Sequence, residues 1–223
     1  AIETITSLNV GGAIIAPLGE NSQRARLKTL GREIPLVFID TPLDDESPFV
    51  GTNNYQSIGL ITDYLCRSGD LPTYFDTPIV NSNAIDRRSA YVQTMEKLGF
   101  EPRFANLAPK DEWDFEGVSF EETARILQRG AFPTRTILCA NDRVAFGVLA
   151  AMYQAGQKVG FCADCQYRVA GHDSQRLSAF TCPPLTTVSQ DCDEMGRLAL
   201  NILFARIDDD RADKSGSAAG DRI

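Results

Sequence analysis

Polar side chains follow several short apolar runs in this 223-residue sequence, at the points where buried strands would end. Asn141 and Asp142 follow one run, His172 and Asp173 follow another, and Gln190 follows a third. In open parallel sheets, ligands bind beyond the carboxyl ends of the strands. These side chains are therefore candidates for binding a small polar molecule.

Helix capping is the competing role for these residues, because Asp and Asn side chains accept hydrogen bonds from the first turn of a helix. For Asp142 and Asp191, which directly precede helical patterns, capping is favoured. For Asn141, Asp173 and Gln190, ligand binding is favoured, because they lie beside the cap positions and have less local hydrogen bonding to do.

Two further groups of residues contain side chains that metal centres or enzymes use. Cys162-x-x-Cys165 offers two sulfur ligands, but a structural zinc needs four, and no second pair has suitable spacing. The motif also precedes a strand, whereas a thioredoxin-like motif opens a helix. His172, the only histidine, lies beside Asp173, but no Gly-x-Ser-x-Gly nucleophile elbow or Gly-x-Gly-x-x-Gly fingerprint is present. We therefore expect no metal, no cofactor and no enzymatic activity.

Strand and helix patterns alternate along the chain and must position these side chains. Apolar residues recur at helical spacing from Ile58, Tyr91, Val144 and Met195, and glycines such as Gly69 follow the stripes at C-cap positions. This alternation predicts an α/β fold with doubly wound parallel sheets. The expected strands are Ala13–Ala16, Leu36–Ile39, Thr73–Phe75, Thr136–Ala140, Arg168–Gly171 and Thr186–Ser189.

Composition excludes several classes of protein. The length of 223 residues suits one large α/β domain or two small ones. Hydrophobic residues make up 43% and charged residues 23%, which suits a packed core and disfavours a disordered chain. The net charge of −8, with no cluster of Lys and Arg, argues against a DNA-binding surface in this chain. No apolar run approaches the ~20 residues that span a bilayer, and the first residues do not resemble a signal peptide. Six cysteines in a chain this long do not indicate a disulfide framework, so we expect a reducing cytoplasm.

Four segments occur in an order that resembles the regulatory domain of the LacI/GalR family. The most specific are Ala-Asn-Asp-x-x-Ala-x-Gly at residues 140–147 and Pro-Pro-Leu-Thr-Thr-Val-x-Gln at residues 183–190. The resemblance implies a type I periplasmic-binding-protein fold, in which crossing strands join two Rossmann-like lobes with parallel sheets and a small effector lies between them. The four segments are Pro35–Asp40, Ile85–Arg88 leading to Tyr91, Ile137–Gly147, and Pro183–Gln190.

The same resemblance implies lobe boundaries. The N-terminal lobe would hold residues 1–67 and 191–206, and the C-terminal lobe residues 68–190. Residues 207–223 would form a polar tail leading toward a missing last strand. Because the family's regulatory domain opens with further elements and its helix-turn-helix head is absent here, we expect a fragment with an incomplete first lobe.

Ligand-binding positions also carry over from the family. Arg87 matches the family's effector-binding arginine, whose fork of donors can hold vicinal hydroxyls or a carboxylate. Asn141, Asp173 and Gln190 match further polar contacts to the effector. Asn54 matches a contact from the first lobe, with capping of its own helix as the equal alternative.

An aromatic wall is implied as well, because an apolar ring face packs against the C–H face of a sugar or a base. Trp113, the only Trp, is the favoured candidate, and Phe115 is its neighbour. In the family this position often holds a stacking aromatic.

The resemblance implies that this chain is the effector-sensing domain of a bacterial repressor. It would form a homodimer in the cytoplasm, bind a sugar or sugar derivative, and reach operator DNA only through a head that this chain lacks. The alternative with the same fold is the periplasmic sugar-binding protein of a transporter, and an enzyme is the third possibility. The segment at 183–190 favours the regulator.

Overall fold

The computed structural model describes residues 2–17, 21–105 and 113–220. The chain divides into two units, and each has its own sheet and core. The larger unit runs from Asn53 to Gln190, and the smaller unit combines the residues up to Thr52 with those from Asp191 onward.

The larger unit is built on four parallel strands in the order β5-β4-β6-β7. Strand β6 occupies a central position, paired with β4 on one side and β7 on the other. This pairing brings the carboxyl ends of these three strands to one edge of the sheet. The strands are β4 (Pro72–Phe75), β5 (Arg103–Ala105), β6 (Thr136–Cys139) and β7 (Arg168–Ala170).

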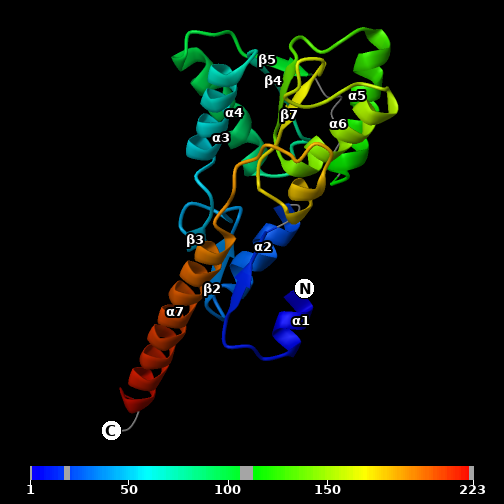
Figure 1. The fold of residues 1–223 in the computed structure, drawn as a ribbon. Coiled ribbons are helices and arrows are strands. Elements are labelled where there is room, and N and C mark those ends of the chain that lie inside the picture. The colour runs from blue at the N-terminus through cyan, green and yellow to red at the C-terminus, as the bar shows by residue number, and fades with distance from the viewer. Residues whose placement is uncertain (1, 18–20, 106–112, 221–223) are drawn as a thin grey trace. The chain divides into compact units, whose positions relative to one another are not determined.

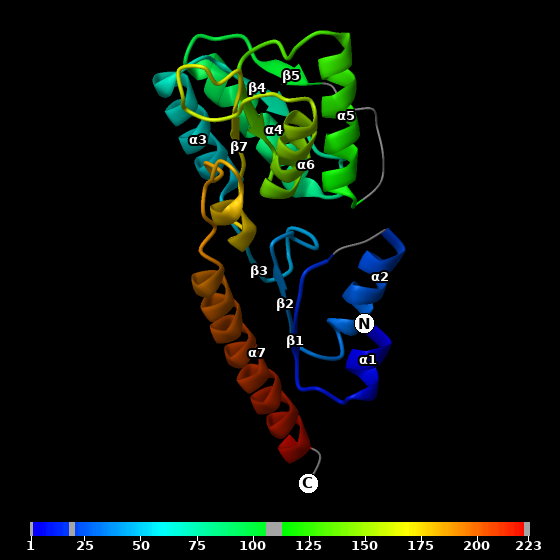
Figure 2. The same cartoon turned by 45° about the vertical axis from the view of Figure 1, so that its right-hand side comes forward.

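Two pairs of helices cover the two faces of this sheet. Helices α3 (Asn54–Ser68) and α4 (Ser82–Lys97) lie on one face, and α5 (Phe115–Arg129) and α6 (Asp142–Gln154) lie on the other (Figures 1 and 2). Alternation along each strand explains the two cores, because successive side chains point to opposite faces. Tyr74 and Leu138 pack in the α3–α4 core, whereas Phe75, Ile137 and Cys139 pack in the α5–α6 core.

The smaller unit has a three-stranded parallel sheet in the order β1-β2-β3. Side chains of α1 and α2 pack on one face of it, and side chains of α7 pack on the other. The elements of this unit are α1 (Ile2–Ser7), β1 (Ala13–Ile15), α2 (Asn21–Leu30), β2 (Leu36–Ile39), β3 (Phe49–Val50) and α7 (Cys192–Gly220).

Most expected elements are confirmed, including all four helical stripes and the strands that became β1, β2, β4, β6 and β7. The expected strand Thr186–Ser189 is not continuous. It makes two single parallel bridges instead, from Thr186 to Ala170 and from Ser189 to Asp173. The short 3₁₀ helix η1 (Arg176–Phe180) precedes it. The sequence patterns did not indicate β3 and β5, because two or three residues are too few to show a period.

Two expected boundaries differ in the structure. Helix α3 belongs to the larger unit, so the division falls between Thr52 and Asn53 and not near residue 67. The physical reason is the shared core of α3 and α4, in which Ile58 and Leu65 pack against Tyr91. The expected polar tail is helical, because α7 continues to Gly220, and Ile207 still packs against the core of the smaller unit. Residues 221–223 of that tail lie outside the described residues.

Candidate functional site

Polar side chains from four parts of the larger unit meet at the carboxyl edge of its sheet. Asp173 follows β7, Arg87 lies in the second turn of α4, Asn54 begins α3, and Gln190 ends the unit. We call these four residues the Arg87 cluster. The cluster occupies the edge at which ligands bind in open parallel sheets.

Arg87 is buried, with 6% of its surface exposed. Its Nε donates to Asn54 Oδ1 at 2.9 Å, its Nη1 to the Ala140 carbonyl at 2.9 Å, and its Nη2 to Asp173 Oδ1 at 2.8 Å. These bonds use three of the five N–H groups of the guanidinium, so two can still donate. Because burying an ion pair costs desolvation energy, the placement favours a functional role over a stabilising one.

Asp173 receives three donors on a single carboxylate oxygen. Arg87 Nη2, His172 Nδ1 and Gln190 Nε2 all bond to Oδ1. In the described part of the chain, no protein donor meets the second oxygen, Oδ2. Burial opposes ionisation, but the hydrogen bond from His172 and the charge of Arg87 outweigh it and lower the pKa of Asp173. The cluster thus presents a charged acceptor beside the remaining donors of Arg87.

The backbone at Asp173 adopts a conformation that L-residues rarely use. Asp173 has φ of 112° and Ser174 has φ of 52°. Two hydrogen bonds hold the pair, one from Asp173 N to the Val188 carbonyl at 2.9 Å and one from Ser174 N to Thr187 Oγ1 at 3.1 Å. Strained backbone of this kind concentrates at functional sites, where the surroundings enforce it.

His172 lies behind Asp173 and is fully buried. Its Nδ1 lies 2.8 Å from Asp173 Oδ1, and its Nε2 lies 2.7 Å from Ser57 Oγ on α3. Because a carboxylate only accepts, Nδ1 carries the proton in the neutral ring, and the Ser57 hydroxyl then donates to Nε2. This row of Ser, His and Asp has the order of a hydrolase triad, but Ser57 is 7% exposed and lies inside the helix–sheet interface. The geometry of this row suits a structural role, in which His172 orients the carboxylate of Asp173.

Asn54 is part of the cluster and not a cap. Asn53 caps α3 by accepting from Gln56 N at 3.0 Å. Asn54 is buried, and its Nδ2 donates to Asn83 Oδ1 at 2.9 Å while its own Oδ1 accepts from Arg87. Of the two roles that the sequence left open for Asn54, the structure excludes capping.

Asn141, and not Asp142 as the sequence indicated, caps α6. Asn141 is the N-cap of α6, because its Oδ1 accepts from Val144 N at 2.9 Å. Asp142, expected to be the cap, is fully buried. The ligand role of Asn141 stays a prediction that rests on its amide nitrogen. The expected cap at Asp191 is confirmed by its bond from Glu194 N at 2.9 Å.

Asp142 organises the segment that follows Asp173. Its carboxylate accepts from Gln175 N at 2.7 Å, Ser178 Oγ at 2.6 Å and Thr187 Oγ1 at 2.7 Å. Burial raises the pKa of Asp142, and these three hydrogen bonds partly oppose that rise. The residue thus joins α6 to the segment that follows Asp173 and to Thr187, which bonds to the Ser174 backbone.

Trp113 lies apart from this network. Its side chain is 41% exposed, its ring contacts Phe115 with centroids 5.6 Å apart, and its carbonyl accepts from Arg143. Among the described contacts, none joins Trp113 to the Arg87 cluster. The expected aromatic wall therefore stays a prediction.

Sequence reasoning missed Ser57 altogether, and although it named His172 and Asp142 at strand ends, it did not predict that His172 bonds to Asp173 or that Asp142 is a buried acceptor. His172 carried a usable signal, since it is the only histidine and ends a strand pattern. Ser57 carried none, because a serine on a helix is ordinary and only the packing of α3 against the sheet brings it to His172.

The fold and the Arg87 cluster together define a parallel α/β ligand-binding domain. The sequence profile of the periplasmic binding protein-like domain family matches residues 53–218. The chain belongs to this family and, within it, to the effector-binding domains of the LacI/GalR regulators.

Three known proteins illustrate the likeness. The HTH-type transcriptional repressor PurR of Histophilus somni (strain 129Pt) is 28% identical over 214 residues, which cover 92% of this chain and 60% of that protein. The ribose operon repressor of Escherichia coli (strain K12) is 28% identical over 208 residues, which cover 92% and 61%. The lac repressor dimer bound to operator and the anti-inducer ONPF shares the fold, with a TM-score of 0.74, 22% identity, and coverage of 93% of this chain and 70% of that one. The chain thus spans about 60% of the length of the curated relatives it matches.

Proposed function

We propose that this chain is the effector-sensing part of a bacterial transcriptional repressor and binds a small polyhydroxylated ligand at the Arg87 cluster. The observation that carries the proposal is the buried ion pair between Arg87 and Asp173 at the carboxyl edge of the sheet. Membership of the LacI/GalR effector-binding domains and the repressor relatives support the regulatory part.

The chemistry of the cluster supports a neutral polyol. The charges of Arg87 and Asp173 cancel, so the pair has no net charge to attract an ion. Asp173 Oδ2 can accept from one hydroxyl, and the remaining N–H groups of Arg87 can donate to the next. Vicinal hydroxyls of a sugar or sugar derivative match this alternation, with Gln190 and Asn141 as further contacts.

The assembly is part of the same proposal. A homodimer is supported by the structural likeness to the lac repressor dimer. Operator DNA would be bound by a head outside this chain, since the net charge of −8 disfavours contact with phosphates. The likeness to the repressor relatives supports a cytoplasmic location for the whole protein. Among the described residues, no helix combines the length and apolar character of a membrane span.

The two alternatives are weaker. The curated relatives compared above are repressors, which does not favour a transporter's periplasmic sugar-binding protein. An enzyme is not supported either, because the one Ser–His–Asp arrangement in the described residues places its serine in the interior. Chemical turnover of a bound sugar would instead support an enzymatic function.

Isothermal titration against pentoses, hexoses, sugar acids and purines tests the proposal. For the ligand found, we expect R87K and D173N to bind about 10- to 100-fold more weakly, because a hydrogen bond to a charged group contributes about 1.5–3 kcal/mol. R87K keeps a positive charge beside Asp173, and D173N keeps the shape of the side chain, so both changes disturb the buried pair less than Ala, which would also leave a cavity.

The matched control is Glu116→Gln, which breaks another Arg–carboxylate pair of the same unit, between Glu116 and Arg143 at 2.6 Å. This variant should bind the ligand as the wild type does. Urea unfolding of each variant separates lost binding from lost structure. Wild-type affinity in both R87K and D173N would show that the ligand binds elsewhere.

A further inference from the structure

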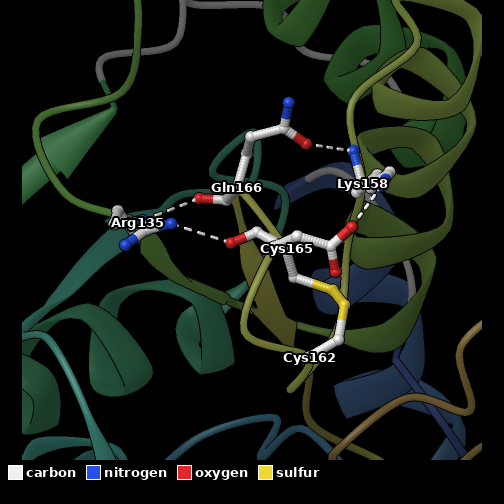
Figure 3. Close-up of a disulfide and its surroundings, with 6 residues drawn as sticks. Arg135, Lys158, Cys162, Cys165 and Gln166 are labelled. Atoms are coloured by element: carbon white, nitrogen blue, oxygen red, sulfur yellow. Dashed lines mark hydrogen bonds and ion pairs between the residues drawn. A yellow bond between two sulfur atoms is a disulfide. The ribbon is translucent and has the colours of Figure 1, made fainter.

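The loop between α6 and β7 contains a disulfide, which the sequence did not predict. Cys162 and Cys165 are bonded, with their Cα atoms 5.1 Å apart (Figure 3). The loop lies at the amino end of β7, whereas the Arg87 cluster lies at the carboxyl edge of the same sheet. The disulfide is therefore a feature that the proposed ligand site does not explain.

We propose that Cys162 and Cys165 form a reversible dithiol–disulfide exchange site for a small, negatively charged thiol and its disulfide. A bond that closes a loop of only four residues removes little entropy from the unfolded chain, so stabilisation is a weak reason for it. In a reducing compartment, which the proposed function assigns to this protein, disulfides are usually transient and redox-active.

Hydrogen bonds that do not involve sulfur hold the loop. Cys165 N donates to the Cys162 carbonyl at 3.0 Å, and Gly160 N donates to the Tyr167 carbonyl at 2.9 Å. The guanidinium of Arg135 donates to the Cys165 carbonyl at 2.8 Å and to the Gln166 carbonyl at 3.2 Å (Figure 3). Because these bonds survive cleavage of the disulfide, the two cysteines stay close together in the reduced protein and can close again.

The two sulfurs differ in access. Cys162 is exposed, whereas Cys165 is buried, with 8% of its surface exposed. Gly160 lies against the inner sulfur, since a Cβ at that position would approach Cys165 Sγ to 3.2 Å. Thiol–disulfide exchange depends on access to the attacked sulfur. Cys162 is therefore the sulfur that meets the external thiol, and Cys165 is the resolving thiol.

Charges around the loop indicate the class of thiol. A shallow cavity of about 240 Å³ adjoins both cysteines, and its wall carries Arg135 and Arg168 against a single carboxylate, Asp70. The nearby Lys158 is already neutralised by its ion pair with Asp164 (Figure 3). The net positive wall favours a thiol that carries carboxylates, such as glutathione.

The exchange proceeds in two balanced steps. A thiolate of the small thiol attacks Cys162 Sγ, a mixed disulfide forms, the bond to Cys165 breaks, and its electron pair leaves on Cys165, which takes a proton from water. A second thiolate attacks the sulfur of the bound thiol and releases the small disulfide, and Cys162 is protonated. The pair gains two electrons and two protons, and two small thiols become one disulfide. The small disulfide drives the reverse reaction.

The first test equilibrates the full chain in glutathione buffers of varied oxidation, with a chelator because Cys162, Asp164 and Cys165 could together hold a metal ion. Exposed Cys182 and Cys192 are replaced by Ser to remove background. Alkylation and mass spectrometry should show both loop thiols appearing together as the buffer becomes reducing. A pair that stays fully oxidised or fully reduced across the series overturns the proposal.

The single variants test the assigned roles. Cys165→Ser should trap glutathione on Cys162, and Cys162→Ser should trap it roughly tenfold more slowly, because access controls the rate. Equal trapping rates would contradict the assignment of Cys162 as the attacked sulfur. Neither variant alters the Arg87 cluster, so the ligand titrations proposed above remain independent of this result.

The charge preference is tested with the wild-type loop, so that no substitution can disturb it. Oxidised glutathione should react with the reduced pair about three- to fivefold faster than a neutral disulfide of similar intrinsic reactivity. A rate ratio of this size corresponds to the small attraction that exposed ion pairs provide. Since salt screens exposed charges, the preference should vanish at 1 M salt. A preference that is absent at low salt, or unchanged by salt, would exclude the anionic class.

Discussion

At the scale of single residues, the candidate site depends on one oxygen atom. Asp173 Oδ1 accepts from Arg87, His172 and Gln190, and this saturation turns Oδ2 into the oxygen that can receive a ligand. His172 fixes the carboxylate from behind, and Ser57 fixes the tautomer of His172. The carboxylate proposed to bind the ligand is thus held in place by its buried neighbours, as is common in preorganised sites.

Substitutions of His172 test this orientation. Asn at this position can still donate to Asp173 from its amide nitrogen, whereas Phe removes both hydrogen bonds and leaves Ser57 without its partner. We expect ligand affinity to fall in the order wild type, H172N, H172F, with about 1–3 kcal/mol lost in folding stability for H172F. Titration calorimetry and urea unfolding measure the two effects. If H172F bound as tightly as H172N, His172 would not position Asp173.

The pH dependence of stability tests the charge of Asp173. Its pKa is lowered in the folded protein from the ordinary value of 3.8. The folded state then binds fewer protons than the unfolded state, so the ionised group stabilises the fold above pH 3.8, and this contribution is lost as the pH falls through the lower folded pKa. D173N cannot ionise and should lose less stability than the wild type between about pH 5 and pH 3. Parallel urea midpoints across that range would contradict the lowered pKa.

At the scale of elements, a close crossing of two helices holds the far side of the sheet. Gly147 of α6 faces α5, and a Cβ there would lie 2.1 Å from Ser119 Oγ and 2.2 Å from the Glu116 carbonyl oxygen. Ser119 Oγ also donates to the Val144 carbonyl at 2.9 Å across the same crossing. Since Asn141 and Asp142 begin α6, the crossing helps to fix the helix that orders the Asp173 segment.

Replacing Gly147 with Ala should therefore destabilise the protein by about 3 kcal/mol, because backbone atoms at the crossing cannot move aside easily. Gly196 in α7 provides the matched control, since a Cβ there meets nothing within 4 Å. G196A should stabilise the helix by up to about 1 kcal/mol, the ordinary gain of Ala over Gly. Thermal unfolding of both variants gives the comparison. Equal shifts of the same sign would show that the crossing is loose.

At the scale of the whole molecule, two separate segments of the chain form the smaller unit, and one continuous segment forms the larger unit. The larger unit is one continuous segment from Asn53 to Gln190, and the smaller unit is assembled from both ends of the chain. All members of the Arg87 cluster, together with His172, Ser57 and Asp142, lie in the continuous segment. Both cores of its sheet are formed by its own helices.

We therefore expect residues 53–190 to fold alone, because the segment buries its own sheet on both faces and has the size of an independent domain. The measurement is cooperative thermal unfolding of the isolated fragment, together with dispersed amide resonances. His172 is the only histidine, so its ring protons report directly on the buried site in the fragment and in the full chain. A molten fragment would show that the larger unit depends on the smaller one.

The sequence alone determined the α/β class, the main strands and helices, and four residues that the structure brings together. Periodicity reports burial on one face of an element, and the position of Arg87, Asp173 and Gln190 in the family's motifs located the cluster. Both signals are local, so they can be read along the chain.

Only the tertiary structure decided the rest, because it depends on which distant segments meet. Whether Asn141 or Asp142 caps α6 is settled by the donors that reach Asp142 from Gln175, Ser178 and Thr187. The shared core of α3 and α4 decides that α3 belongs to the larger unit. The polar residues that lie at separate strand ends in the sequence form a single network in the structure, and its hydrogen bonds join residues up to 115 positions apart.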